Sequence, residues 1–256
     1  MTTAINDQRP TVGGSTLSRV AAVVRLQFTN PWSILILPWL IMMAILAMNI
    51  AVWWLILQAT PTANHAEIRE GFSYSGAGSF IFVYMLVVAV QAINGYFPFA
   101  LGYGVTRRNY YLGISVTFVL LSALFTVVMS LLGGIEEATD GWGLGGAIFT
   151  AAYTGDGWAQ RAFVYFVLLL FFFFIGSTVA AIYVRWKTTG MVAFFVGLAF
   201  LLIGIGALIT LTESWNGVGE WFARTGLIGS YAWSLAITAI AAVAGYGVLR
   251  RATPKD

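Results

Sequence analysis

Apolar residues along the chain form six long runs, and the segments between them hold nearly all of its charged residues. The runs cover Ser33–Gln58, Phe80–Ala100, Gly113–Leu132, Phe163–Val184, Gly190–Leu211 and Leu227–Leu249, and none has a charged residue in its interior. A helix needs roughly 20 mainly apolar residues to cross a bilayer, where the backbone must satisfy its own hydrogen bonds. The pattern therefore predicts an all-α membrane protein with six transmembrane helices.

The segment before the first run has its own periodicity. Five apolar residues recur at helical spacing on one face, while Arg19 and Arg25 project elsewhere: Leu17, Val20, Ala21, Val24 and Phe28. Asn30-Pro31 then marks a helix break, because the residue before proline avoids helical geometry. This predicts an amphipathic interfacial helix within a cytoplasmic N-terminus, residues 1–32. Two alternatives stay open. Val23 and Leu26 interrupt the polar face, so part of it could pack on protein, or the segment could extend the first span.

The cations lie mainly on one side of the predicted spans. Ten of the thirteen Lys and Arg residues fall in one set of segments: Arg9, Arg19, Arg25, Arg107, Arg108, Arg185, Lys187, Arg250, Arg251 and Lys255. The opposite set holds Arg69, Arg161 and Arg224 together with most of the acids, including Glu136, Glu137 and Asp140. Because cytoplasmic loops carry the excess of Lys and Arg, both termini are predicted to be cytoplasmic. The spans then occupy residues 33–249, followed by a cytoplasmic tail, residues 250–256.

Composition supports the membrane assignment and excludes several chemistries. The 256 residues are 59% hydrophobic and only 9% charged, against roughly 25% charged in soluble domains. The net charge of +3 is small and polarised, so nucleic acid is not an expected partner. Without cysteine there is no disulfide, thiolate nucleophile or cysteine metal site. The longest predicted external loop, Gly133–Ala162, carries Trp142, Phe149, Tyr153 and Trp158, which suggests that it lies at the outer membrane interface.

Residues suited to catalysis are scarce. The single histidine, His65, has no second histidine at zinc-ligand spacing, and the chain contains no phosphate-binding P-loop motif. We expect no catalytic residue, metal or cofactor in this chain, and no enzymatic activity by itself. The spans lack the ionisable groups of ion-coupled carriers but hold the amides Asn49, Gln91 and Asn94. These amides either make interhelical hydrogen bonds or line a translocation route.

The short cytoplasmic connection between spans two and three is unusually basic. It reads GYGVTRRNYY from Gly102 to Tyr111, with Pro98 shortly before it. One interpretation is that Arg107 and Arg108 only orient the loop and touch anionic headgroups of membrane lipid. The other is that a tight turn, permitted by Gly102 and Gly104, docks on a soluble partner.

The layout resembles the permease subunits of ABC-2-type exporters, with an elbow helix, six spans, tight cytoplasmic loops and the sequence GVTRRNYY. The resemblance implies a coupling element that contacts a separate ABC ATPase, with ATP and Mg²⁺ bound on that partner. The partner-coupling residues would be Gly104, Thr106, Arg107, Arg108, Asn109, Tyr110 and Tyr111, with the two tyrosines anchored in the inner interface. A second permease copy, identical or related, would complete the transporter.

This resemblance predicts a protein of the cytoplasmic membrane that exports a lipophilic compound, a lipid or a peptide, in drug resistance or immunity. The connection TESWNGVGEWFARTGL is short for the re-entrant helical pair of larger relatives, so no gating role is carried over to it. The alternative is a membrane scaffold or sensor that transports nothing. A further alternative, an intramembrane enzyme, lacks paired polar catalytic groups.

Overall fold

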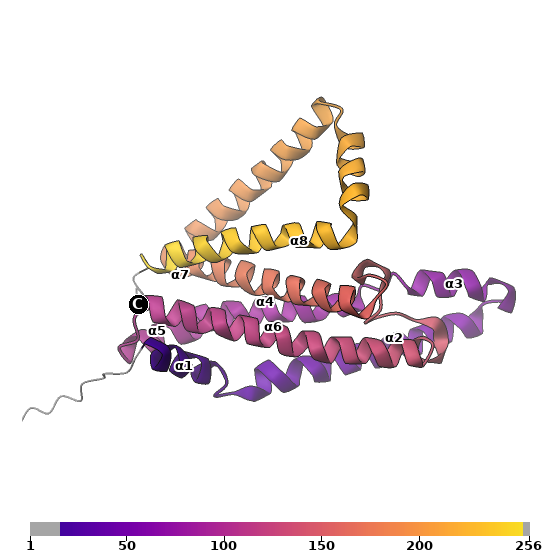
Figure 1. The fold of residues 1–256 in the computed structure, drawn as a ribbon, viewed down its shortest axis with the longest axis horizontal. Coiled ribbons are helices and arrows are strands. Elements are labelled where there is room, and N and C mark those ends of the chain that lie inside the picture. Colours follow the sequence, from indigo (N-terminus) through magenta and orange to yellow (C-terminus); the bar gives the residue numbers. More distant parts are fainter. Residues whose placement is uncertain (1–15, 253–256) are drawn as a thin grey trace, which may run out of the picture.

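The computed structural model describes residues 16–252, which are helical throughout apart from turns and short loops (Figure 1). Two short helices flank α2 along the chain, α1 (Thr16–Gln27) before it and α3 (His65–Phe72) after it. The remaining α-helices are α2 (Leu37–Ala59), α4 (Phe80–Gln91), α5 (Phe97–Gly102), α6 (Arg107–Ala138), α7 (Trp158–Leu211) and α8 (Trp215–Leu249). Short 3-10 or π-helical turns join them: η1 (Trp32–Ile36), η2 (Thr62–Asn64), η3 (Ala77–Ser79), η4 (Ala92–Tyr96), η5 (Gly141–Gly145) and η6 (Ala152–Thr154).

Five helical segments of the described chain, some with a turn or kink inside them, are long and apolar enough to cross a membrane. They are Trp32–Ala59, Thr62–Gly102, Arg107–Ala138, Trp158–Leu211 and Trp215–Leu249. The all-α class and the multi-pass membrane character expected from the apolar runs are therefore confirmed. The fourth and fifth predicted spans both fall within α7, which has 54 residues and one non-helical position, Lys187 (φ 54°, ψ −145°).

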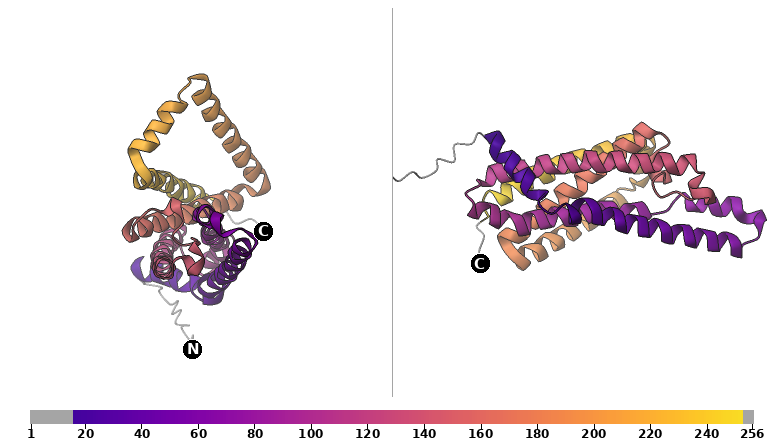
Figure 2. Two further views of the ribbon diagram at one scale, coloured as in Figure 1. Left: turned by 90° about the vertical axis from the view of Figure 1, so that its right-hand side faces the viewer. Right: turned by 90° about the horizontal axis from the view of Figure 1, so that it is seen from below.

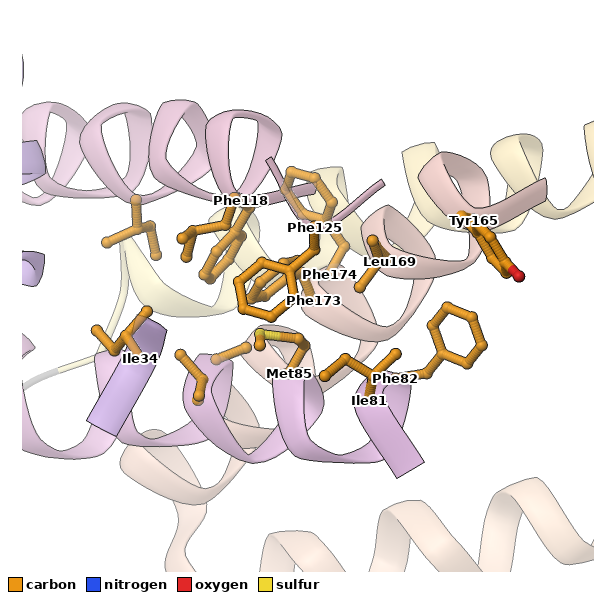
Figure 3. Packing of buried hydrophobic residues seen from close by; sticks show 14 of the residues in the cluster. Ile34, Ile81, Phe82, Met85, Phe118, Phe125, Tyr165, Leu169, Phe173 and Phe174 are labelled. Carbon is orange, nitrogen blue, oxygen red and sulfur yellow. The ribbon is translucent and has the colours of Figure 1, made fainter. Parts of the chain in front are cut away.

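The core of the bundle lies where α4, α6 and the first part of α7 meet. Aromatic and aliphatic side chains from these helices interdigitate there (Figure 3). Phe118 of α6 stacks on Phe173 of α7 with ring centroids 4.7 Å apart, and Met85 of α4 is completely buried. Stacked rings contribute about 1 kcal/mol beyond the burial of their area, so this contact holds α6 against α7.

The segment before the first span is a separate helix, α1, and one face of it packs against the rest of the protein. The break expected at Asn30-Pro31 falls between α1 and η1. Val23 of α1 is 1% exposed, while Leu17 of the predicted apolar face is 80% exposed. A Cβ added at Gly113 of α6 would lie 2.5 Å from the Cβ of Val23, so the missing side chain lets α1 pack directly on α6. Of the two faces considered above, the one containing Val23 is the one that contacts protein.

The second part of α7 and the first part of α8 stand away from the bundle. Figure 1 shows them as two sides of a triangle whose third side, the rest of α8, packs along α7; the end view in Figure 2 shows the same projection. The chain leaves the bundle at Lys187 and returns to it at Gly226 (φ 66°, ψ −179°), and the apex of the triangle is the turn at residues 212–214. We call residues 188–225 the projecting arm. Its apolar side chains are exposed, including Phe200 at 72% and Ile203 at 66%.

Candidate functional site

The basic connection is a tight turn between the end of α5 and the start of α6. Gly104 has φ 78°, and its N–H donates to the carbonyl of Leu101 while the N–H of Val105 donates to that of Ala100. This pair of bonds is the glycine-dependent helix end in which the residue after the cap turns left-handed. Thr106 then begins α6, because its hydroxyl accepts from the N–H of Asn109 at 3.2 Å. Residues 103–106 are therefore held in a defined turn by backbone and cap bonds.

The two arginines of this connection have different surroundings. Arg107 is half-buried, and its Nη1 donates to the carbonyl of Arg250 at the end of α8, 2.9 Å away. Arg108 is exposed, and its side chain makes no hydrogen bond or ion pair with any residue between 16 and 252. Cations favour helix C-terminal carbonyls because of the partial negative charge there. Arg107 thus fastens the turn to the end of α8, and Arg108 is left available.

The next three residues of the motif point into the protein. Asn109 is 7% exposed, Tyr110 is fully buried and Tyr111 is 6% exposed. The hydroxyl of Tyr110 donates to the carbonyl of Ala92 in η4, and that of Tyr111 donates to the carbonyl of Ala242 in α8. The sequence-based expectation put Asn109 on the partner surface and both tyrosines in the membrane interface. In the structure Asn109 is buried, and the two tyrosine side chains instead tie α6 to η4 and α8.

The three amide side chains of the predicted spans do not lie together in the protein interior. Asn49 is half-buried, and its Nδ2 donates to the carbonyl of Ile45 in its own helix at 2.9 Å. Gln91 and Asn94 lie at the junction of α4 and η4, where both are exposed. An exposed amide on an apolar helix is costly in lipid unless it meets a polar partner or water. The interhelical hydrogen bonds considered for these residues are therefore not made within the described chain.

The long loop between α6 and α7 contains a buried carboxylate that sequence reasoning missed. Glu136, at the end of α6, is 1% exposed. Its carboxylate accepts from the main-chain N–H groups of Ile148, Phe149 and Thr150 at 2.8–3.3 Å, from the Thr150 hydroxyl at 2.6 Å and from Trp142 Nε1 at 2.9 Å. Hydrogen bonds to a charged acceptor are stronger than neutral ones. Glu136 therefore determines where the loop folds back over the bundle.

A second charged side chain also holds this loop in place. Arg161, at the start of α7, is 3% exposed, and its Nη2 bonds Glu137 at 2.7 Å. The hydroxyl of Tyr153 donates to the carbonyl of Ser75. Burial raises the pKa of Tyr153, and the nearby Tyr231 and Glu136 raise it further. Of the aromatic residues expected at the membrane interface, Phe149 is instead completely buried within the protein. The signal in the sequence was an acid that directly follows an apolar run and precedes a glycine-rich loop.

The chemistry available to these clusters is limited. All oxygens of Glu136 accept from donors already in place, so the group is not free to act as a base. Between residues 16 and 252, no three His, Cys, Asp or Glu side chains lie close enough to hold a metal ion. What the site offers is instead a rigid connection between helices. The basic turn contacts the end of α8, and the tyrosines that follow it contact the inside of the bundle.

Comparisons with known proteins identify no relative. No protein-family model, curated protein or solved structure matches the chain. The interpretation of the basic turn therefore rests on the motif and on the contacts described above.

Proposed function

We propose that this chain is the membrane permease subunit of an ABC exporter of the cytoplasmic membrane. A separate ATPase, carrying ATP and Mg²⁺, would bind the turn at residues 103–108, and two permease copies would form the path of a lipophilic compound, lipid or peptide. The observation that carries the proposal is the bond from Arg107 to the carbonyl of Arg250. It means that a force on the turn reaches the end of α8 without passing through flexible chain.

The tyrosines of the motif support the same mechanism. Tyr110 bonds the η4 carbonyl of Ala92, and Tyr111 bonds the α8 carbonyl of Ala242. The start of α6 is thus joined by side chains to two other helices. Packed elements of this kind move as rigid bodies when one of them is displaced. Transport by alternating access would use that displacement, with the ATPase as its source.

In this proposal α7 supplies two spans, for a total of six. A straight helix of 54 residues would be about 80 Å long, well beyond a hydrocarbon core of about 30 Å. Lys187 divides it into two segments of at least 24 residues each, and each is long enough to cross. Six spans place both termini on one side, which agrees with the basic residues of α1, the α5–α6 turn and the end of α8.

The projecting arm and the exposed amides support a second copy. The arm presents apolar side chains that are largely exposed, such as Leu208 at 65%. Gln91 and Asn94 need polar surroundings at membrane depth. A path between two permeases would supply those surroundings. Because the spans carry no charge, the path suits an apolar or amphiphilic cargo.

The proposal is tested by the partner and by the two arginines. Tagged protein purified from its native membrane should bring an ATPase subunit and ATP hydrolysis with it, whereas the permease alone should hydrolyse no ATP. At equal membrane levels, the double change Arg107→Lys and Arg108→Lys should weaken ATPase association about tenfold. Lysine keeps the charge, but at position 108 it loses the planar fork that grips a carboxylate through two bonds, and at position 107 it offers fewer donors to the Arg250 carbonyl.

The matched control is Arg185→Lys, the same exchange in the other short basic connection. It should leave ATPase association unchanged. Equal association and equal export by the double variant would show that the arginines only set topology. If no ATPase accompanies the wild-type chain, the scaffold or sensor alternative replaces the transporter.

A further inference from the structure

A lateral groove lies between α6 and α8 at the basic end of the bundle. It encloses about 350 Å³ and is lined almost entirely by apolar atoms; its residues include Arg108, Leu112, Ser115, Ala242, Val243 and Tyr246. Leu112 is 41% exposed and Val243 is 73% exposed, so the groove opens on the surface of the apolar helices. The groove is therefore apolar and accessible from the side, with its one charged residue, Arg108, at the basic end.

Most polar groups along the groove already have partners. The Tyr111 hydroxyl donates to the Ala242 carbonyl at 2.7 Å, and Ser115 Oγ donates to the Tyr111 carbonyl at 2.8 Å. Arg108 and the hydroxyl of Tyr246 bond no residue within 16–252. The groups left to bind a ligand are thus a guanidinium and a phenol, both hydrogen-bond donors.

The charge around the opening is strongly positive. Arg107, Arg108, Arg250 and Arg251 come together where α6 begins and α8 ends, because Arg107 bonds the Arg250 carbonyl. The described acidic residues lie elsewhere: in α3, at the end of α6 and in the loop between α6 and α7, and in the projecting arm. An anion is therefore attracted here, whereas the cationic part of a zwitterionic headgroup is repelled. Clusters of Lys and Arg near a membrane surface attract anionic lipid.

We propose that this groove binds an anionic phospholipid, with its phosphate on Arg108 and Tyr246 and one acyl chain along Leu112, Ala242 and Val243. Charge selects the headgroup, since arginine offers paired donors to phosphate oxygens. The apolar lining selects a lipid over free phosphate, because a chain in the groove removes its walls from water. The bound lipid would touch both α6 and α8 and so reinforce their contact beside the Arg107 bond. This inference does not depend on the transport function.

The experiment measures lipid binding by the purified chain. Thermal unfolding in neutral detergent is followed while phosphatidylglycerol, phosphatidylcholine or inorganic phosphate is added. Phosphatidylglycerol should raise the unfolding temperature and saturate; the other two should have little effect. Arg108→Gln should weaken the apparent affinity for phosphatidylglycerol about tenfold or more, the loss expected for a charge-assisted bond.

Two further variants separate the groove from general attraction. Ala242→Phe fills the groove two turns from the basic turn and should also weaken binding about tenfold; Ser115→Phe does the same from α6 if Ala242→Phe does not fold. Arg25→Gln removes one exposed charge from α1 at the same end and should leave the affinity unchanged. The proposal is overturned if Arg25→Gln weakens binding as much as Arg108→Gln, or if phosphatidylcholine stabilises equally. Equal stabilisation by inorganic phosphate, or full affinity in the filled variants, would overturn it as well.

Discussion

Glu136 shows at the scale of single residues how one buried side chain determines the path of a loop. Its carboxylate accepts from three consecutive main-chain N–H groups, from Ile148 to Thr150. Residues 148–150 lie outside any helix, so no helical carbonyl of their own segment accepts from these N–H groups. Because buried donors must find an acceptor, the loop takes the one position in which Glu136 serves all three.

We therefore expect Glu136→Gln to destabilise the protein by about 3 kcal/mol. The amide keeps the shape but places its own N–H groups against donors. Thermal unfolding in detergent measures the loss, and Glu67→Gln, at an exposed position of α3, is the control and should have almost no effect. Equal unfolding temperatures for the two variants would contradict the structural role of Glu136.

Gly245 is a second residue whose role depends on its neighbours. A Cβ added there would lie 2.8 Å from Thr178 Oγ1 and 3.0 Å from the Tyr111 hydroxyl, whereas one added at Gly247 meets nothing within 4 Å. Both side chains bond α8 carbonyls, of Ala241 and Ala242. The two glycines lie in the same helix, so their replacement by alanine differs only in these contacts.

Gly245→Ala should thus lower the unfolding temperature, because it disturbs two hydrogen bonds of about 1 kcal/mol each. Gly247→Ala should raise it slightly, since alanine favours a helix over glycine by about 0.5–1 kcal/mol. Thermal unfolding of the two single variants checks the opposite signs. A stabilising Gly245→Ala would mean that α8 does not approach Thr178 and Tyr111 so closely.

At the scale of whole elements, the division of α7 depends on one strained residue. Lys187 has φ 54° and ψ −145°, a conformation that side chains with a Cβ rarely adopt. Gly226 also has a positive φ with an extended ψ (φ 66°, ψ −179°) where α8 bends, and there glycine fits without strain. Both ends of the projecting arm thus use a left-handed φ, and only lysine is strained by it.

Comparison of alanine and glycine at position 187 tests this geometry. Both substitutions remove the lysine side chain, so any contact that it makes is lost equally. Lys187→Gly should be more stable than Lys187→Ala by about 1 kcal/mol, the strain relieved. At the helical Thr189 the order should reverse, with glycine the less stable by about 0.5–1 kcal/mol. The unfolding temperatures of the four variants test both expectations. If the alanine variant is the more stable one at both positions, α7 is an unbroken helix.

At the scale of the whole molecule, the open question is how often α7 crosses the membrane. The chain has no cysteine, so single cysteines can report their side. Glu67→Cys, Tyr103→Cys and Glu213→Cys lie in three different connections and at exposed positions. With two crossings in α7, Glu213 shares a side with Glu67; with one crossing, it shares a side with Tyr103.

We expect an impermeant thiol reagent to label Glu67→Cys and Glu213→Cys in intact cells. Tyr103→Cys should be labelled only after the cells are broken, because its connection carries the basic residues. Labelling of Glu213→Cys together with Tyr103→Cys would show five crossings and contradict the proposed topology. Reversal of all three would place the basic turn outside and exclude a cytoplasmic ATPase there.

The sequence by itself determined the helical class, the membrane character, the break before the first span and the turn between α5 and α6. These features depend on local properties: the length of apolar runs, the effect of proline on its predecessor, and the glycine and threonine that end one helix and begin the next. None of them requires knowledge of which helices touch. The motif from Gly104 to Thr106 could therefore be interpreted correctly as a tight turn.

Only the tertiary structure decided which polar residues are buried and which are available. Within one motif, Arg108 is exposed while Asn109 and Tyr110 are inside, because packing against α1 and η4 sets the rotation of α6. The same holds for the exposed Gln91 and for Glu136, whose partners lie a dozen residues away along the chain. In spans that are apolar all round, no hydrophobic stripe marks the inner face. Helix rotation there follows from side-chain fit between neighbours, such as Val23 against Gly113, which the sequence pattern does not contain.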